Sequence, residues 1–228
     1  VNLAFISNAN NIFFGDFRLH GQLANIAYLP VPWLKLTAYG YLLDFKDSVA
    51  ARQDTQTLGL RASGELEAGP GKFSYALEYA QQSDYADAPA NVEADYSLLE
   101  AGYGSKAVGG KLGYEVLGSN GGLYGLQTPL ATLHAHDGWA DQFLNTPATG
   151  LRNTYASVNG ALGAWSGLLR YHVWQADFGG ADYGDEVDVL ASYAVNDAFL
   201  LSAKYADYKA DTFSVDTRKT WLIAEYKF

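Results

Sequence analysis

Segments of about ten residues in which apolar and polar side chains alternate recur along most of the chain, and they constrain the fold more than any other feature. The segment 72–82, KFSYALEYAQQ, places three aromatic rings and a leucine on one side and mostly small or charged residues on the other. The segments 108–117 and 186–194 repeat this arrangement. A period of two is the side-chain period of a β-strand, so the sequence predicts an all-β fold.

Turn residues separate these segments and allow the strands to be counted. The sequence predicts one domain over 1–228 with twelve strands, at 1–7, 21–29, 33–45, 55–67, 72–82, 94–104, 108–117, 151–161, 166–177, 186–194, 198–208 and 217–228. The segment 21–29 has no clear alternation, so its two faces are not assigned.

Two architectures fit this pattern, because a soluble barrel or sandwich buries its apolar face whereas a membrane barrel turns that face to lipid. The predicted connections alternate in length. The short ones are 30–32, 68–71, 105–107, 162–165 and 195–197. The long ones are 8–20, 46–54, 83–93, 118–150, 178–185 and 209–216. Short turns at one rim and long loops at the other are typical of an outer-membrane barrel.

Aromatic residues stand beside the short turns and favour the membrane barrel over a soluble core capped by rings. They are Tyr28, Trp33, Phe73, Tyr103, Trp165, Tyr193, Phe199, Tyr226 and Phe228. Such a ring is the interfacial girdle of a membrane barrel. The mean hydropathy of −0.11 is compatible with a membrane barrel, because apolar and polar residues that alternate along a strand cancel in a hydropathy average. We therefore expect an antiparallel transmembrane β-barrel of about twelve strands.

The last strand, TWLIAEYKF, resembles the C-terminal strand of bacterial outer-membrane proteins. The chain also resembles the outer-membrane porins related to the alginate-export barrels, through the segments 35–45, 75–85, 111–122, 127–151, 204–211 and 216–228. The resemblance implies a Gram-negative outer membrane, contact with its lipid and lipopolysaccharide, and an assembly signal at Tyr226 and Phe228 that the barrel-assembly machinery reads. Members of that group are generally longer. The chain is thus either the C-terminal part of a larger barrel or a twelve-stranded form that closes by itself.

With the apolar face toward lipid, the polar face would line a lumen. The expected lining is Lys35, Thr37, Tyr39, Arg61, Ser63, Glu65, Glu78, Glu100, Lys111, Glu115, Asn153, Tyr155, Asn159, Arg170, His172, Glu186, Asp188, Lys204, Lys219, Glu225 and Lys227. Its charges are nearly matched, which indicates either cross-strand ion pairs or a solute path. The expected function is passive diffusion of small hydrophilic solutes; the alternative is a plugged barrel with a structural or partner-binding role.

The segment 118–150 is too long for an ordinary hairpin loop and too apolar for a disordered one. We expect it to fold into the lumen as a constriction, with an extracellular flap as the alternative. Asp137 is a candidate N-cap for a short helix carrying Trp139 and Phe143 on one face. The expected constriction residues are Gln127, Leu130, His134, His136, Asp137, Trp139, Asp141 and Phe143.

Other chemistry receives less support from the sequence. His134, His136, Asp137 and Asp141 offer metal-ligand types, but their spacing matches no known zinc pattern. A lipid hydrolase would need a nucleophile bonded to an oriented base, and His172 lacks a GxSxG partner motif. No cofactor and no catalytic residue are expected. The net charge of −10 excludes a nucleic-acid partner, and the acid-rich predicted loops would repel polyanions such as alginate.

Overall fold

The computed structural model describes residues 1–10, 15–47, 54–88, 92–131, 134 and 137–228. Twelve strands make up the fold: β1 (Asn2–Asn10), β2 (Asp16–Val31), β3 (Leu34–Phe45), β4 (Thr55–Ala68), β5 (Gly71–Asp84), β6 (Glu93–Gly104), β7 (Val108–Leu117), β8 (Leu151–Leu162), β9 (Trp165–Gln175), β10 (Asp182–Asn196), β11 (Phe199–Ala210) and β12 (Thr217–Tyr226). Among these residues no helix is long and apolar enough to cross a membrane.

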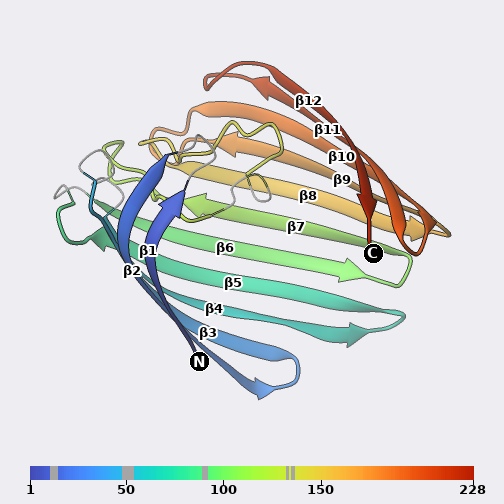
Figure 1. Cartoon of the computed structure of the whole chain (residues 1–228), viewed down its shortest axis with the longest axis horizontal. Coiled ribbons are helices and arrows are strands. Elements are labelled where there is room, and N and C mark those ends of the chain that lie inside the picture. The colour runs from blue at the N-terminus through green and yellow to red at the C-terminus, as the bar shows by residue number, and fades with distance from the viewer. Residues whose placement is uncertain (11–14, 48–53, 89–91, 132–133, 135–136) are drawn as a thin grey trace.

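The strands form one antiparallel sheet in which each strand pairs with the next along the chain. The sheet is strongly curved, and its concave side holds the described residues of the connection 118–150, called the loop below (Figure 1). In the described part of the chain β1 pairs with β2 and β12 with β11, and no ladder joins β1 to β12. The predicted all-β fold and strand count are confirmed, but the alternative of twelve strands that close by themselves is wrong for this structure.

The two faces of the sheet differ as the alternation predicts. On the convex face Leu60, Leu112 and Leu169 are 67%, 65% and 52% exposed. Their neighbours Arg61, Lys111 and Arg170 point to the concave face and surround a cavity there. Apolar side chains outside and polar side chains inside are the arrangement of a membrane barrel wall.

The aromatic residues beside the short turns lie on the surface, as a girdle requires. Tyr28, Trp33, Tyr103 and Trp165 are between 45% and 64% exposed. The rings of Trp165 and Tyr193 pack with centroids 4.8 Å apart across the hairpin of β9 and β10. These exposed rings need an environment that is partly apolar and partly wet, which a bilayer interface supplies.

Two predicted long connections are shorter than expected because bulges disturb the alternation. The expected loop 8–20 is wrong, since β1 runs to Asn10 and β2 begins at Asp16, with a register irregularity between Ile6 and Asn8. Likewise β10 begins at Asp182, and its pairing with β9 shifts before Gly184. Gly184 has φ +135, and a Cβ there would lie 2.1 Å from the Lys209 carbonyl oxygen, so the bulge requires glycine.

Candidate functional site: the concave face and its loop

The loop 118–150 packs onto the concave face through an aromatic cluster. Phe143 is 2% exposed, and its ring lies 4.9 Å from Trp174 of β9 and 6.0 Å from Tyr208 of β11, measured between centroids. Trp139 and Ala140 belong to the same buried cluster. Burying aromatic rings of this size is the main force that holds a loop against a wall.

Hydrogen bonds attach the loop to two further strands. The Gln82 side chain on β5 accepts from the Tyr124 hydroxyl at 2.6 Å and from the Gln127 backbone N–H at 2.9 Å. On the other side Glu186 of β10 accepts from the Ala140 backbone N–H at 2.8 Å. The loop therefore contacts the concave face both at β5 and at β10.

The predicted short helix after Asp137 is wrong. Gly138 has φ +82 and Asp141 has φ +59, and a right-handed helix requires negative φ at both positions. The segment instead forms successive turns, which leave the Ala140 N–H free to reach Glu186. Trp139 and Phe143 still reach one apolar cluster, but through turns and not through a helical repeat.

A group of charged and aromatic residues joins the loop to β11 and β12. We call it the latch, and its members are His134, Trp139 and Asp141 of the loop, Lys204 of β11, and Lys219 and Trp221 of β12. The Lys204 ammonium lies 4.0 Å from the Trp139 ring centroid and 4.9 Å from that of Trp221. Asp141 contacts His134 Nδ1 and accepts from Lys219 Nζ, each at 2.6 Å. Cation–π contacts and partly buried ion pairs of this kind each add a modest stabilisation, about 1 kcal/mol or less.

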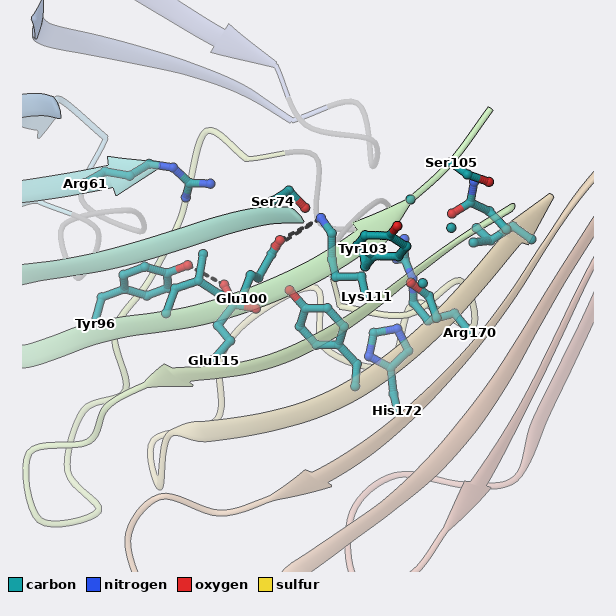
Figure 2. A pocket seen from close by; sticks show the side chains of 18 residues that line it. Arg61, Ser74, Tyr96, Glu100, Tyr103, Ser105, Lys111, Glu115, Arg170 and His172 are labelled. Carbon is teal, nitrogen blue, oxygen red and sulfur yellow. Dashed lines mark hydrogen bonds and ion pairs between the residues drawn. The ribbon is translucent and has the colours of Figure 1, made fainter. Parts of the chain in front are cut away.

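Two cavities remain open on the concave face beside β3–β9. The turn-side cavity, about 690 Å³, is lined by Arg61, Tyr96, Glu100, Lys111, Glu115, Tyr155, Arg170 and His172 among others (Figure 2). The loop-side cavity, about 580 Å³, lies between the segment 126–131 and β2–β7. Arg61, Tyr96 and Glu115 border both cavities, so the two spaces meet at these side chains.

Cross-strand pairs organise the charges where the cavities meet. Glu78 forms an ion pair with Arg61 of the adjacent strand and accepts from the Tyr39 hydroxyl at 2.6 Å. Lys111 donates to Glu100 at 2.6 Å, as Figure 2 shows. The expected cross-strand ion pairs are thus present. They fix the rotamers of long side chains in a space that stays accessible.

Asp137 on the loop faces this charged belt. Its side chain is 5% exposed, and its Oδ1 has no hydrogen-bond partner among the described residues. Burial raises the pKa of the Asp137 carboxyl well above its ordinary value, and the nearby Glu115 carboxylate raises that pKa further. A buried acid of this kind favours either a proton or a compensating cation.

His172 is buried in the wall beside the turn-side cavity. Its Nδ1 lies 2.9 Å from Asn153 Oδ1, and its ring stacks on Trp174 with centroids 4.8 Å apart. Its Nε2 lies 3.9 Å from an Asp188 oxygen and has no hydrogen-bond partner among the described residues. The residues nearest the two ring nitrogens are thus Asn153 and Asp188, whereas a hydrolase would place the hydroxyl of its nucleophile there.

The structure brings most of the predicted lining residues together and leaves a few apart. Tyr39, Arg61, Glu78, Glu100, Lys111, Glu115, Tyr155, Arg170 and His172 border the two cavities. Asn153 and Asp188 are buried near His172, and Lys204 lies in the latch. Lys35, Glu65 and Glu225 are exposed residues that border neither cavity.

The expected loop residues divide between the cavity and the packed cluster. Gln127, Leu130 and Asp137 border the loop-side cavity, whereas His134, Trp139, Asp141 and Phe143 belong to the latch or the aromatic cluster. His136 lies outside the described residues, so the expected set of four metal-ligand types is not tested as a whole. Among the residues that are described, no group of three His, Asp or Glu is arranged to hold a metal ion.

Two residues of the site, Tyr96 and Gln82, were not expected from the sequence. The Tyr96 hydroxyl donates to Glu115 at 2.5 Å, and Gln82 holds the loop. Both share the parity of an expected lining residue on their own strand, Glu100 for Tyr96 and Glu78 for Gln82. Parity could therefore have indicated that they face inward, although nothing in the sequence indicates their partners.

Solved structures of outer-membrane proteins share this fold. Pseudomonas aeruginosa OccK10 (OpdN) matches with a TM-score of 0.69 and 18% identity over 95% of this chain and 66% of that one. Acinetobacter baumannii OccAB2 matches at 0.68 with 17% identity, covering 91% of this chain and 54% of that one. The outer membrane protein OpdK of P. aeruginosa, in a structure with vanillate, matches at 0.65 with 15% identity, covering 92% and 56%.

The chain thus has the fold of the wall of an outer-membrane barrel, and it spans between 54% and 66% of the length of these solved proteins. No protein-family model matches the chain, and no curated protein matches it. The fold therefore rests on the solved structures and on the geometry described above.

Proposed function

We propose that these twelve strands and their loop form part of a channel in the outer membrane of a Gram-negative bacterium, through which small hydrophilic solutes diffuse passively. One observation supports the proposal most strongly: two cavities that share Arg61, Tyr96 and Glu115 follow the concave face, on the side opposite the exposed leucines. The turn-side cavity is lined mainly by polar side chains, and the loop-side cavity by polar and apolar ones. A face of this chemistry fits water and solute, and the opposite face fits lipid.

The proposal concerns the whole barrel to which the strands contribute. The free edges of β1 and β12 carry backbone groups that need hydrogen-bond partners within a bilayer, because lipid offers none. The outer-membrane proteins with this fold are longer than this chain. Contact of the convex face with outer-membrane lipid and lipopolysaccharide, and recognition of Tyr226 and Phe228 by the barrel-assembly machinery, belong to the same proposal.

The loop 118–150 is proposed as the constriction of this channel. Its aromatic cluster occupies the β9–β11 side of the concave face, and its segment 126–131 borders the loop-side cavity. A solute would then pass beside β3–β7, under Gln127 and Leu130. The cavity, about 580 Å³, is of the size that holds small molecules.

The resemblance to the alginate-export barrels is proposed as a relationship between folds and not as a guide to the solute. Asp84, Asp87, Asp182 and Asp211 lie in the long connections or at the strand ends next to them, and like charges at an entrance repel a polyanion. No polyanion is therefore proposed as the solute.

Liposome swelling and planar-bilayer recording of the reconstituted barrel test the function. We expect stepwise conductance and swelling with small neutral solutes, which decline as the solute grows beyond the size of a monosaccharide. An inserted, folded barrel without conductance would favour the alternative, a plugged barrel with a structural or partner-binding role.

A further inference from the structure

The loop-side cavity carries an excess of acidic groups. Its charged lining consists of the Arg61 guanidinium and the carboxyl groups of Glu78, Glu115 and Asp137. Arg61 is already paired with Glu78. The remaining two acids form no ion pair among the described residues, since Glu115 accepts from the Tyr96 hydroxyl and Asp137 Oδ1 is unpartnered and buried. Among the described residues that line the cavity, two acidic groups therefore have no basic partner.

Aromatic rings stand next to these acids. The Tyr39 and Tyr41 rings stack with centroids 5.0 Å apart, and both line the loop-side cavity together with Tyr96. Tyrosine faces attract cations, and an attraction of this kind adds to that of a carboxylate. The hydroxyls of Tyr39 and Tyr96 donate to Glu78 and Glu115 and so hold the two carboxylates in place.

The same cavity also has an apolar lining. Leu43, Leu117, Leu126, Pro129 and Leu130 line it, with the last three supplied by the loop. These side chains offer contact to a hydrocarbon body and cannot replace the hydration shell of a small ion. The described residues also contain no three-ligand group suited to a metal ion. A cavity that combines unpaired acids and tyrosine rings with leucine side chains fits an organic cation better than either a metal ion or an anion.

We propose that the loop-side cavity binds a small organic cation, with an ammonium or guanidinium group directed at Glu115 and Asp137 and an apolar body against Leu43, Leu126 and Leu130. The inference rests on the proposed channel function, because a solute would reach the cavity along the lumen. It names the solute class that the constriction favours, namely amphipathic cations over anions of the same size.

Calorimetry on the folded barrel in detergent tests the site without requiring conduction. The probes are benzylammonium, benzyl alcohol and benzoate, which share one ring and differ in charge. We expect benzylammonium to bind at least about tenfold more tightly than benzoate, which corresponds to one charge-assisted hydrogen bond. Equal or tighter binding of benzoate would overturn the inference.

Variants locate the binding. Glu115→Gln and Asp137→Asn keep the side-chain shape and should each weaken benzylammonium binding about tenfold, while benzyl alcohol binding stays unchanged. Glu67→Gln is the matched control, since Glu67 is an acid near the short-turn rim whose side chain is 80% exposed. Asp137 lies outside the strands, so its variant does not depend on strand folding. Unchanged benzylammonium binding in both folded variants would overturn the site.

Bilayer recording separates this inference from the proposed function. If the barrel conducts but binds benzoate and benzylammonium equally tightly, the cation site is refuted and the channel function stands. If the barrel binds benzylammonium through Glu115 and Asp137 but does not conduct, the cation site stands and the channel function is refuted.

Discussion

The two halves of the concave face are built in opposite ways. Along β9–β11 the loop fills the space with Trp139 and Phe143 against Trp174 and Tyr208, and these side chains are at most 7% exposed. Along β2–β7 the same loop leaves the loop-side cavity open, and the turn-side cavity continues from it along β4–β9; charged and tyrosine side chains border both. A single loop can thus be anchored on one wall while it shapes a passage along the other.

The difference follows from the side chains that each half turns inward. Inward residues of β9–β11 include rings that bury well against other rings, and an aromatic cluster is held by its apolar area. Inward residues of β4–β7 include Arg61, Glu78, Glu100 and Lys111, which retain water unless they are paired. The packed half therefore supplies stability, and the charged half supplies the surface that a solute meets.

Removal of the loop should have the largest effect, because it abolishes the difference between the halves. Deletion of residues 128–147 leaves only short segments after β7 and before β8. It removes Trp139 and Phe143 from the aromatic cluster, and it removes the loop residues 128–131 and Asp137 from the lining of the loop-side cavity. We expect single-channel conductance in planar bilayers to rise at least about twofold, since a constriction limits conduction. Conductance equal to that of the intact barrel would show that the loop does not constrict it.

A single truncation on the packed half should release the loop from its wall. Phe143→Ala removes a ring that contacts Trp174, Tyr183, Tyr208 and Phe213, at a cost of about 3 kcal/mol in loop docking. Hydrogen exchange of the Ala140 amide, which is bonded to Glu186, should accelerate. Phe178→Ala is the control, since Phe178 is 52% exposed. Retained protection in the Phe143 variant would argue against the aromatic anchor.

A charge change on the open half should alter selectivity rather than loop docking. Arg61→Gln removes the basic residue that borders both cavities and leaves Glu78 without its ion-pair partner. We expect the reversal potential in a KCl gradient to shift toward cation selectivity by a few-fold in permeability ratio, because one positive charge leaves a narrow path. Lys106→Gln, in a short turn, should change it little. An unchanged potential for Arg61→Gln would place the ion path elsewhere.

The smallest expected effect is a pH dependence that couples the two halves through Asp137. Its pKa is raised by burial and by Glu115, so the protonated form favours the docked loop. The contribution of Asp137 to the stability of the docked loop is fully present below the ordinary aspartate pKa of about 4. This contribution is lost as pH rises through the raised pKa. Arg61 and Glu78 line the same cavity and act on the same charge. Asp137→Asn should flatten the pH profile of loop hydrogen exchange, and a profile that keeps its slope would assign it to another group.

The alternation in the sequence was enough to predict the twelve strands and which side chains share a face. It failed where a bulge adds a residue, as between Ile6 and Asn8, because one extra residue reverses the parity of everything after it. The alternation also could not predict the conformation of the loop. The spacing of Trp139 and Phe143 suits a helix, but the positive φ values at Gly138 and Asp141 are incompatible with one.

Partners far apart in sequence were the other limit. Gln82 and Tyr124 meet across 42 residues, and Glu186 meets Ala140 across 46. Such pairs depend on the curvature of the sheet and on the strands against which the loop packs. Neither is a property of a local segment of the sequence. Parity therefore indicated which side chains face inward, and most of the expected lining residues border the cavities. Their division into a packed and an open half required the structure.

Cysteine accessibility tests this division most directly, because the chain contains no native cysteine to contribute background. Thr57→Cys places a thiol in the loop-side cavity, and Ala206→Cys places one under the aromatic cluster, where Ala206 is fully buried. With a small methanethiosulfonate reagent added to barrels in bilayers, we predict rapid modification and a stepwise current decrease at Thr57→Cys, and modification of Ala206→Cys only after residues 128–147 are deleted. Equal reaction rates at the two positions in the intact barrel would contradict the account.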